Sequence, residues 1–180
     1  MSATSFDTQA DLLQELVSAS STFQTLCGES TVAATKKHTA LAQAEDEDDD
    51  ESNTPQKLGY PRAIVADGGI VDIESISMSD CRGTGSLFLS FEFEIPKASR
   101  TSMAVKRAWF VTKVSAIIQE MWTTSKSRAT PSGYTTSHLQ LLRTTRVNGP
   151  GEYPQDVVDQ GDENTTPPGP IWAMEFEVTY

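Results

Sequence analysis

Residues 86–95 alternate apolar and polar side chains over their whole length, and this pattern constrains the fold more than any other feature. The apolar set at every second position is Leu87, Leu89, Phe91, Phe93 and Ile95. Successive side chains of a strand point to opposite faces of a sheet. The alternation therefore predicts a strand of an antiparallel sheet with one covered and one hydrated face. The chain ends, at 171–180, on a second stretch with the same alternation.

Two stretches with helical spacing supply the cover for such a sheet. A helix is predicted from Ser99 or Thr101 to about Thr124. Its apolar stripe consists of Met103, Phe110, Val114, Ile117, Ile118 and Met121. A second helix is predicted over 7–27, with Gly28 as its C-cap.

The remaining elements are shorter. We expect a small helix over 30–44, strands over 60–66 and 70–78, and another strand over 137–147. Turns are predicted at 67–69 and 80–85, where Gly and Asp cluster.

Together these elements predict one α+β domain over residues 1–180. It consists of a mostly antiparallel sheet of about five strands, with two or three helices packed on one face and long loops. A chain of 180 residues is long enough to bury such a core.

Two polar stretches are predicted as loops, an acidic mobile loop over 45–57 and a Pro/Gly-rich loop over 148–170. Residues 45–51 form an unbroken acidic run, which cannot bury itself without a large loss of hydration. Three interpretations stay open: a solvated loop without a partner, a surface that repels something negative, or a dock for something basic. The run lacks the glycine and the final glutamate of an EF-hand calcium loop.

The charge balance restricts the partners. The net charge is −11 and the pI is about 4.5, which argues against a surface that grips nucleic acid. Lys36-Lys37 and Lys106-Arg107 are interpreted as solvated helix charges. The first residues lack the pattern of a signal peptide, and no apolar run approaches a membrane span. We therefore expect a soluble protein that is made in the cytoplasm and contacts no membrane.

The sequence offers no convincing catalytic set. Cys27 with His38, and Cys81 with His138, are the nearest thiol and imidazole pairs, and neither has an evident third group. Gly83-Thr-Gly85 precedes a strand and is interpreted as a turn. We expect no enzyme, no cofactor and no metal site.

The outer faces of the two alternating strands carry paired carboxylates, which we expect to form a hydrated, negative sheet face. If several copies lined a channel with this face, the channel would repel DNA phosphates. Together with the acidic run, these carboxylates are the candidate interaction residues: Glu45, Asp46, Glu47, Asp48, Asp49, Asp50, Glu51, Glu92, Glu94, Glu175 and Glu177.

The layout of the chain resembles a known family. A leading helix ends in Ser-Thr-Phe-Gln-Thr-Leu-Cys-Gly (21–28), and a predicted small-residue helix with Ala33-Ala34 and His38 follows. Pro61-Arg-Ala-Ile-Val65, the 87–95 strand, a Trp-bearing helix and the 172–178 strand complete it. This layout, over about residues 8–180, resembles the α+β neck and tail-terminator proteins of long-tailed bacteriophages.

The resemblance implies a structural virion protein that assembles into a ring, usually of six subunits, at the top of the tail tube. Such a ring caps the tube and joins it to the head, and DNA passes through it without specific binding. Its partners are further copies of itself, the tail tube protein and the head-tail connector proteins. Two alternatives remain open, a head-closure (stopper) or other connector protein, and an acidic non-catalytic binding module for a basic partner.

Overall fold

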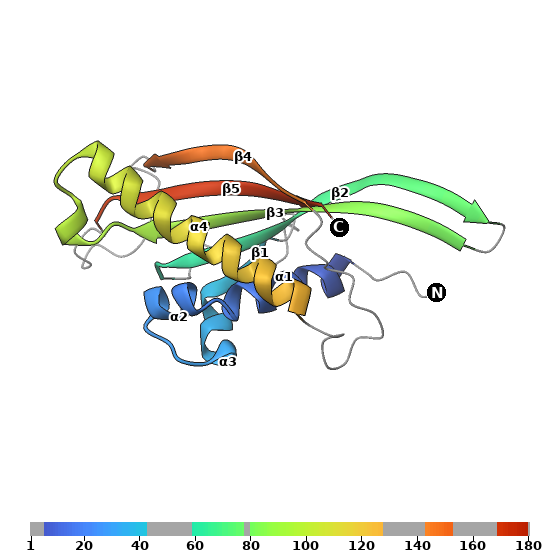
Figure 1. The fold of residues 1–180 in the computed structure, drawn as a ribbon, viewed down its shortest axis with the longest axis horizontal. Coiled ribbons are helices and arrows are strands. Elements are labelled where there is room, and N and C mark those ends of the chain that lie inside the picture. Colours follow the sequence, from blue (N-terminus) through green and yellow to red (C-terminus); the bar gives the residue numbers. More distant parts are fainter. Residues whose placement is uncertain (1–5, 43–58, 78–79, 128–142, 153–168, 180) are drawn as a thin grey trace, which may run out of the picture.

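The structure is a computed structural model that describes residues 6–42, 59–77, 80–127, 143–152 and 169–179. Within these residues, one five-stranded sheet has the order β1-β2-β3-β5-β4 (Figure 1). The strands are β1 (Thr39–Ala42), β2 (Arg62–Ser77), β3 (Asp80–Glu94), β4 (Arg143–Glu152) and β5 (Ile171–Thr179). Only the β1–β2 pair is parallel, so the predicted α+β class with a mostly antiparallel sheet is confirmed.

The predicted helix over 7–27 is divided into α1 (Phe6–Ser18) and α2 (Ser21–Cys27). The break lies at Ser20, whose backbone is extended and whose side-chain oxygen accepts a hydrogen bond from the Phe23 amide at 3.1 Å. Serine favours this N-cap role because it satisfies an amide that has no partner within the helix. Gly28 ends α2 at a φ of 71°, the left-handed conformation that favours glycine, which confirms the predicted C-cap.

The helix predicted over 30–44 is wrong. The structure has a single turn α3 (Val32–Thr35), a 3-10 turn η1 (Lys36–His38) and then strand β1. Parallel pairing with β2, from Thr39 opposite Ala63 to Ala42 opposite Ala66, gives β1 the hydrogen bonds that a helix would otherwise supply. The small side chains of 39–42 suit either conformation, so tertiary pairing decides.

Strand β2 runs without interruption through the turn predicted at 67–69, so that prediction is also wrong. Asp67 lies opposite Leu87 and Gly69 opposite Ser86, which leaves Gly68 as the extra residue of a β-bulge. A side chain at Gly68 would collide with Ser86, so this close approach requires glycine. The turn predicted at 80–85 lies within β3 for the same reason, since these residues pair with β2.

The β2–β3 hairpin is longer than the rest of the sheet. Its partner β5 pairs with β3 only from Ser86 to Glu94, and β1 pairs with β2 only up to Ala66. Among the described strands, residues 69–77 therefore pair only with β3, and residues 80–85 pair only with β2. Figure 1 shows this part of the hairpin extending beyond the helices and the other strands. We call residues 69–77 and 80–85 the hairpin arm.

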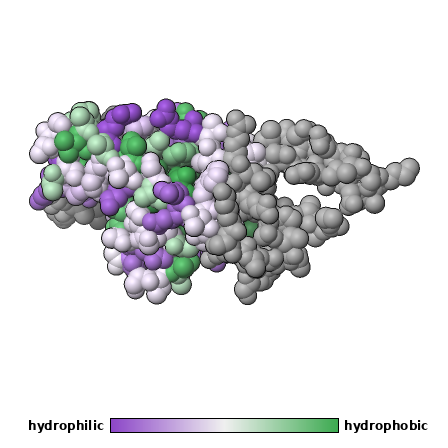
Figure 2. Space-filling view, in the orientation of Figure 1, coloured by the Kyte–Doolittle hydropathy of each residue, from purple (hydrophilic) through white to green (hydrophobic). Residues whose placement is uncertain are grey.

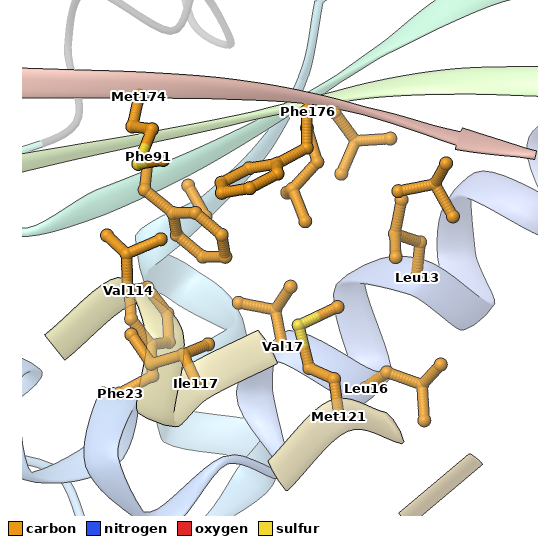
Figure 3. Close-up of a cluster of buried hydrophobic side chains, with 14 of the residues drawn as sticks. Leu13, Leu16, Val17, Phe23, Phe91, Val114, Ile117, Met121, Met174 and Phe176 are labelled. Carbon is orange, nitrogen blue, oxygen red and sulfur yellow. The ribbon is translucent and has the colours of Figure 1, made fainter. Parts of the chain in front are cut away.

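The core lies between one face of the sheet and the helices α1, α2 and α4 (Met103–Ser127). Phe23 of α2 packs against Phe91 and Phe93 of β3, with ring centroids 6.4 and 6.2 Å apart. Figure 3 shows side chains from the helices and from β3 and β5 pointing toward one another: Leu13, Leu16, Val17, Phe23, Phe91, Val114, Ile117, Met121, Met174 and Phe176. The apolar positions that the alternation predicts to be covered are buried in β3 and, as far as Val178, in β5.

Helix α4 confirms the long helix, with two corrections. Its N-terminus is capped by Ser102, whose hydroxyl accepts from the Val105 amide at 3.2 Å, and not by Ser99 or Thr101. Met103, the first member of the predicted stripe, is 61% exposed and does not belong to the core.

Strand β4 is described from Arg143, so the predicted residues 137–142 lie outside the described part. It continues through 148–152, which were predicted as the start of a loop. A register shift between Asn148 and Gly151 accommodates Gly149-Pro150, and another lies between Arg146 and Asn148. In the described sheet β4 is an edge strand, where a proline without an amide donor is tolerated. The rest of that predicted loop, 153–168, lies outside the described residues.

Candidate interaction surface

The acidic run Glu45–Glu51, and the loop predicted over 45–57, lie outside the described residues. Their part in an interaction remains a prediction. The other four candidate carboxylates are described, and they separate into two groups with different surroundings.

Register places all four on the sheet face that points away from the core, with Glu94 at the end of β3. Glu92 lies opposite Arg62 on β2 and Ala173 on β5. Along the same two strands, β3 and β5, Glu175 lies opposite Ser90, and Glu177 lies opposite Phe88. Residues that lie directly opposite each other on adjacent strands share a face of the sheet.

Glu92 is not hydrated, which corrects the prediction for this residue. Its side chain is only 4% exposed, and its Oε2 lies 2.6 Å from Nε of Arg62, itself 11% exposed. The Arg62 guanidinium also stacks over the Tyr60 ring, 4.7 Å from the ring centroid. A buried carboxylate needs such a partner, because desolvation of an unpaired charge is very costly. Glu92 is therefore neutralised within the fold and offers no free charge.

Glu94 holds together three segments at the end of β3. Its Oε1 accepts from Nη2 of Arg100 at 2.8 Å and from the Gly169 amide at 3.0 Å. Arg100 follows the 3-10 turn η3 (Lys97–Ser99) and also donates from Nε to the Ile95 carbonyl at 2.7 Å. The charge of Glu94 is exposed but already neutralised within the chain.

The remaining two carboxylates, both on β5, are half-buried and less engaged. Glu175 accepts a hydrogen bond from the Asn148 side chain, an uncharged partner. Glu177 lies between Phe88 and Thr145 and forms no ion pair with any other residue that the structure describes. The free negative charge of this face is therefore concentrated on Glu175 and Glu177, and we call these two the β5 carboxylates.

A fifth carboxylate, Glu120 of α4, was not singled out in the sequence. It accepts from the Ser20 hydroxyl at 2.7 Å, the Thr22 amide at 3.1 Å and the Thr22 hydroxyl at 2.6 Å. Burial alone would raise the pKa of Glu120, but the hydrogen bonds from Thr22 and Ser20 outweigh it and lower that pKa. A negative charge here also suits the N-terminus of α2. Only the tertiary structure brings these residues together, so no local pattern marks them.

A basic and apolar surface was also missed. Lys106 was interpreted as a solvated charge, but it lies 3.1 Å from Glu152 of β4, whereas Arg107 is exposed as expected. Next to them Met103 and Val105 are 61% and 41% exposed. Figure 2 shows hydrophobic and hydrophilic residues interleaved over the area where Figure 1 draws α4. The sequence does carry a signal for this surface, since residues 97–119 contain no Asp or Glu.

No hydrogen bond between described side chains joins the candidate thiol Cys27 to the imidazole of His38. Burial, with a smaller contribution from Glu29, raises the pKa of Cys27 to about 12, so the thiol stays protonated at neutral pH. His38 instead contacts the Pro61 carbonyl through Nδ1 at 3.3 Å, with Nε2 3.8 Å from Glu29. His138 lies outside the described residues. Among the described side chains, no three potential metal ligands come together.

No protein-family model matches the chain, and no curated protein is significantly similar to it. Among the described helices, none combines the length and the apolar character that a bilayer crossing requires.

Proposed function

We propose that this chain is a structural protein of the neck of a long-tailed bacteriophage, a tail terminator. Copies of it form a ring, of six subunits on the family resemblance, that caps the tail tube and joins it to the head. The hairpin arm is the observation that carries the assembly part of this proposal. The phage assignment rests on the resemblance of the layout of the chain.

In the part of the sheet that the structure describes, the backbone of the arm pairs only within the β2–β3 hairpin. Nine residues of β2, 69–77, extend about 30 Å at the usual rise per residue. An isolated two-stranded ribbon is only marginally stable in water. Two register shifts within this part, between Ile70 and Asp72 and between Ser75 and Ser77, weaken its ladder further. A ribbon that leaves the body of its own domain gains stability by lying against another one, as in an assembly.

The charge of the chain agrees with a ring that DNA traverses. At a net charge of −11, the protein as a whole repels phosphates. DNA would then pass without specific binding, and no cofactor or metal takes part. The protein acts in the virion through contacts with its own copies, the tube protein and the connector proteins.

Negative-stain electron microscopy of the purified protein, alone and mixed with bare tail tubes, tests the proposal. We expect rings of about tube diameter and caps at one end of each tube. A variant in which a two-residue Asn-Gly turn replaces residues 70–85, between the paired residues Gly69 and Ser86, removes most of the arm but keeps the strands that pair with β1 and β5. This variant should fold, as judged by circular dichroism, and should lose both rings and caps.

Particles of about the monomer mass, 19.6 kDa, that never contact a tube would refute the terminator role. Binding to portal particles and not to tubes would reassign the protein to head closure. Rings that persist in the arm-deleted variant would show that the arm does not build the assembly.

A further inference from the structure

Charge is strongly segregated along this chain. Residues 97–119 carry Lys97, Arg100, Lys106, Arg107 and Lys113 but no acidic residue, so the whole acidic excess lies elsewhere. Lys106 and Arg100 are neutralised by Glu152 and Glu94. Lys97, Arg107 and Lys113 form no ion pair with any described residue. Arg107 and Lys113 belong to α4 and Lys97 to η3, so this acidic protein keeps cations without a described ion-pair partner on α4 and just before it.

The side of α4 that faces away from the sheet differs from an ordinary solvated helix face. Its exposed positions carry small or uncharged side chains: Ala104, Ala108, Thr112, Ser115 and Gln119. Arg107 and Lys113 flank this row, while Met103 and Val105 are exposed at its N-terminal end. A solvent-facing helix surface is normally charged. Small side chains flanked by free cations and exposed apolar residues suit close contact with an acidic surface.

A complementary surface lies on the opposite side of the same molecule. The core-facing side of α4 packs on one face of the sheet, and the β5 carboxylates lie on the other face. Beside them Phe88, Ile64 and Ala66 are only half-buried, so apolar area accompanies the acidic groups there too. The two surfaces match in charge and in apolar character, and they point in opposite directions.

We propose that copies of this chain associate head to tail, with the outward face of α4 in one copy seated on the β5 carboxylates of the next. A contact between two different surfaces repeats from copy to copy and closes into a ring when the rotation allows it. Back-to-back pairing of two α4 faces would instead place cation against cation. This contact rests on the proposed ring and names the surfaces that build it. Electrostatic matching of this kind fixes the register and the choice of partner.

Charge reversal tests the contact. Arg107→Glu and Glu177→Lys each place like charges together, and each should raise the dissociation constant at least about tenfold in sedimentation velocity experiments. Lys37→Glu is the matched control, because Lys37 is exposed on η1, forms no ion pair with a described residue and undergoes the same charge change. Circular dichroism and melting curves establish that all variants fold.

Two experiments that restore opposite charges at the contact distinguish it from a general effect of charge on assembly. The double variant Arg107→Glu/Glu177→Lys restores opposite charges in every contact and should assemble close to the wild-type level. An equimolar mixture of the two single variants should also recover, because alternating copies again oppose Glu to Lys and Arg to Glu.

If the dissociation constants of the single reversals lie within about twofold of the wild-type value, the contact is refuted but the proposed ring is not. The same conclusion follows if neither the double variant nor the mixture restores assembly. A wild-type protein that stays monomeric at every concentration would overturn the ring and this contact together. Open oligomers that respond to the reversals as described would support the contact while removing the ring.

Discussion

The Arg62–Glu92 ion pair gives the sharpest test of the physical picture, because both charges are almost completely withdrawn from water. We consider Glu92→Leu, which leaves the Arg62 guanidinium buried without this carboxylate. The reverse change, Arg62→Met, leaves the Glu92 carboxylate without that cation. The double variant removes both charges and fills the space with apolar side chains of similar volume.

The magnitude follows from the burial of the two side chains, which are 11% and 4% exposed, with their charged atoms 2.6 Å apart. Breaking a buried pair from one side costs about 3–5 kcal/mol. We expect about 3 kcal/mol for Glu92→Leu, since Arg62 keeps its contact with the Tyr60 ring. In a domain of this size that loss lowers Tm by about 6–12 °C. The double variant should lie within about 1 kcal/mol of the wild type, because replacing a buried pair by well-packed apolar groups is often neutral.

Urea unfolding, followed by circular dichroism at concentrations where the chain is monomeric, measures these differences. Glu177→Leu on the same sheet face is the matched control and should cost less than about 0.5 kcal/mol, because that carboxylate has no ion pair with a described residue. A loss below about 1 kcal/mol for Glu92→Leu would contradict the assignment of a buried, structural pair. So would a double variant whose loss equals the sum of the two single losses.

Three further expectations concern the core and its attachments. Phe23→Ala should cost about 3–5 kcal/mol in urea unfolding, since the ring is fully buried against β3, and a loss under 1.5 kcal/mol would contradict this packing. Glu120→Gln should destabilise the protein at pH 7. Because the lowered pKa of Glu120 stabilises the fold only above the ordinary pKa of glutamate, the difference should disappear as pH falls through the folded value, and a pH-independent difference would refute it. In a Cys81→Ser background at pH 8, Cys27 should react with a thiol reagent about a thousandfold more slowly than in urea, and equal rates would contradict its pKa of about 12.

The strands and the long helix could be predicted from the sequence because each carries its own periodic pattern. Alternation over 86–95 and 171–180 identifies the apolar residues of the covered face, and those that the structure describes are buried. The Gly28 cap is equally local, since it depends on the conformation of one residue. Patterns within a single element are sufficient for this level of the fold.

The errors arise where a partner far along the chain decides. Residues 39–42 form a strand because β2 lies beside them, and Asp67-Gly68-Gly69 forms a bulge because β3 continues past it. The same holds for Glu92: alternation places it on the outer face, but only the β2–β3 register brings Arg62 opposite. Neither the separation of these residues in sequence nor their types indicates the pairing.

Counting carboxylates along strands therefore overestimates the negative charge that a sheet presents. Of the four strand carboxylates, Glu92 and Glu94 are neutralised by arginines of the same chain, and both arginines are visible in the sequence once the register is known. What remains is a smaller acidic surface at Glu175 and Glu177, which faces away from a helix that keeps its own free cations. Since a charge already paired within the chain contributes little to a partner, a search for partner contacts should begin with these two residues and with Arg107.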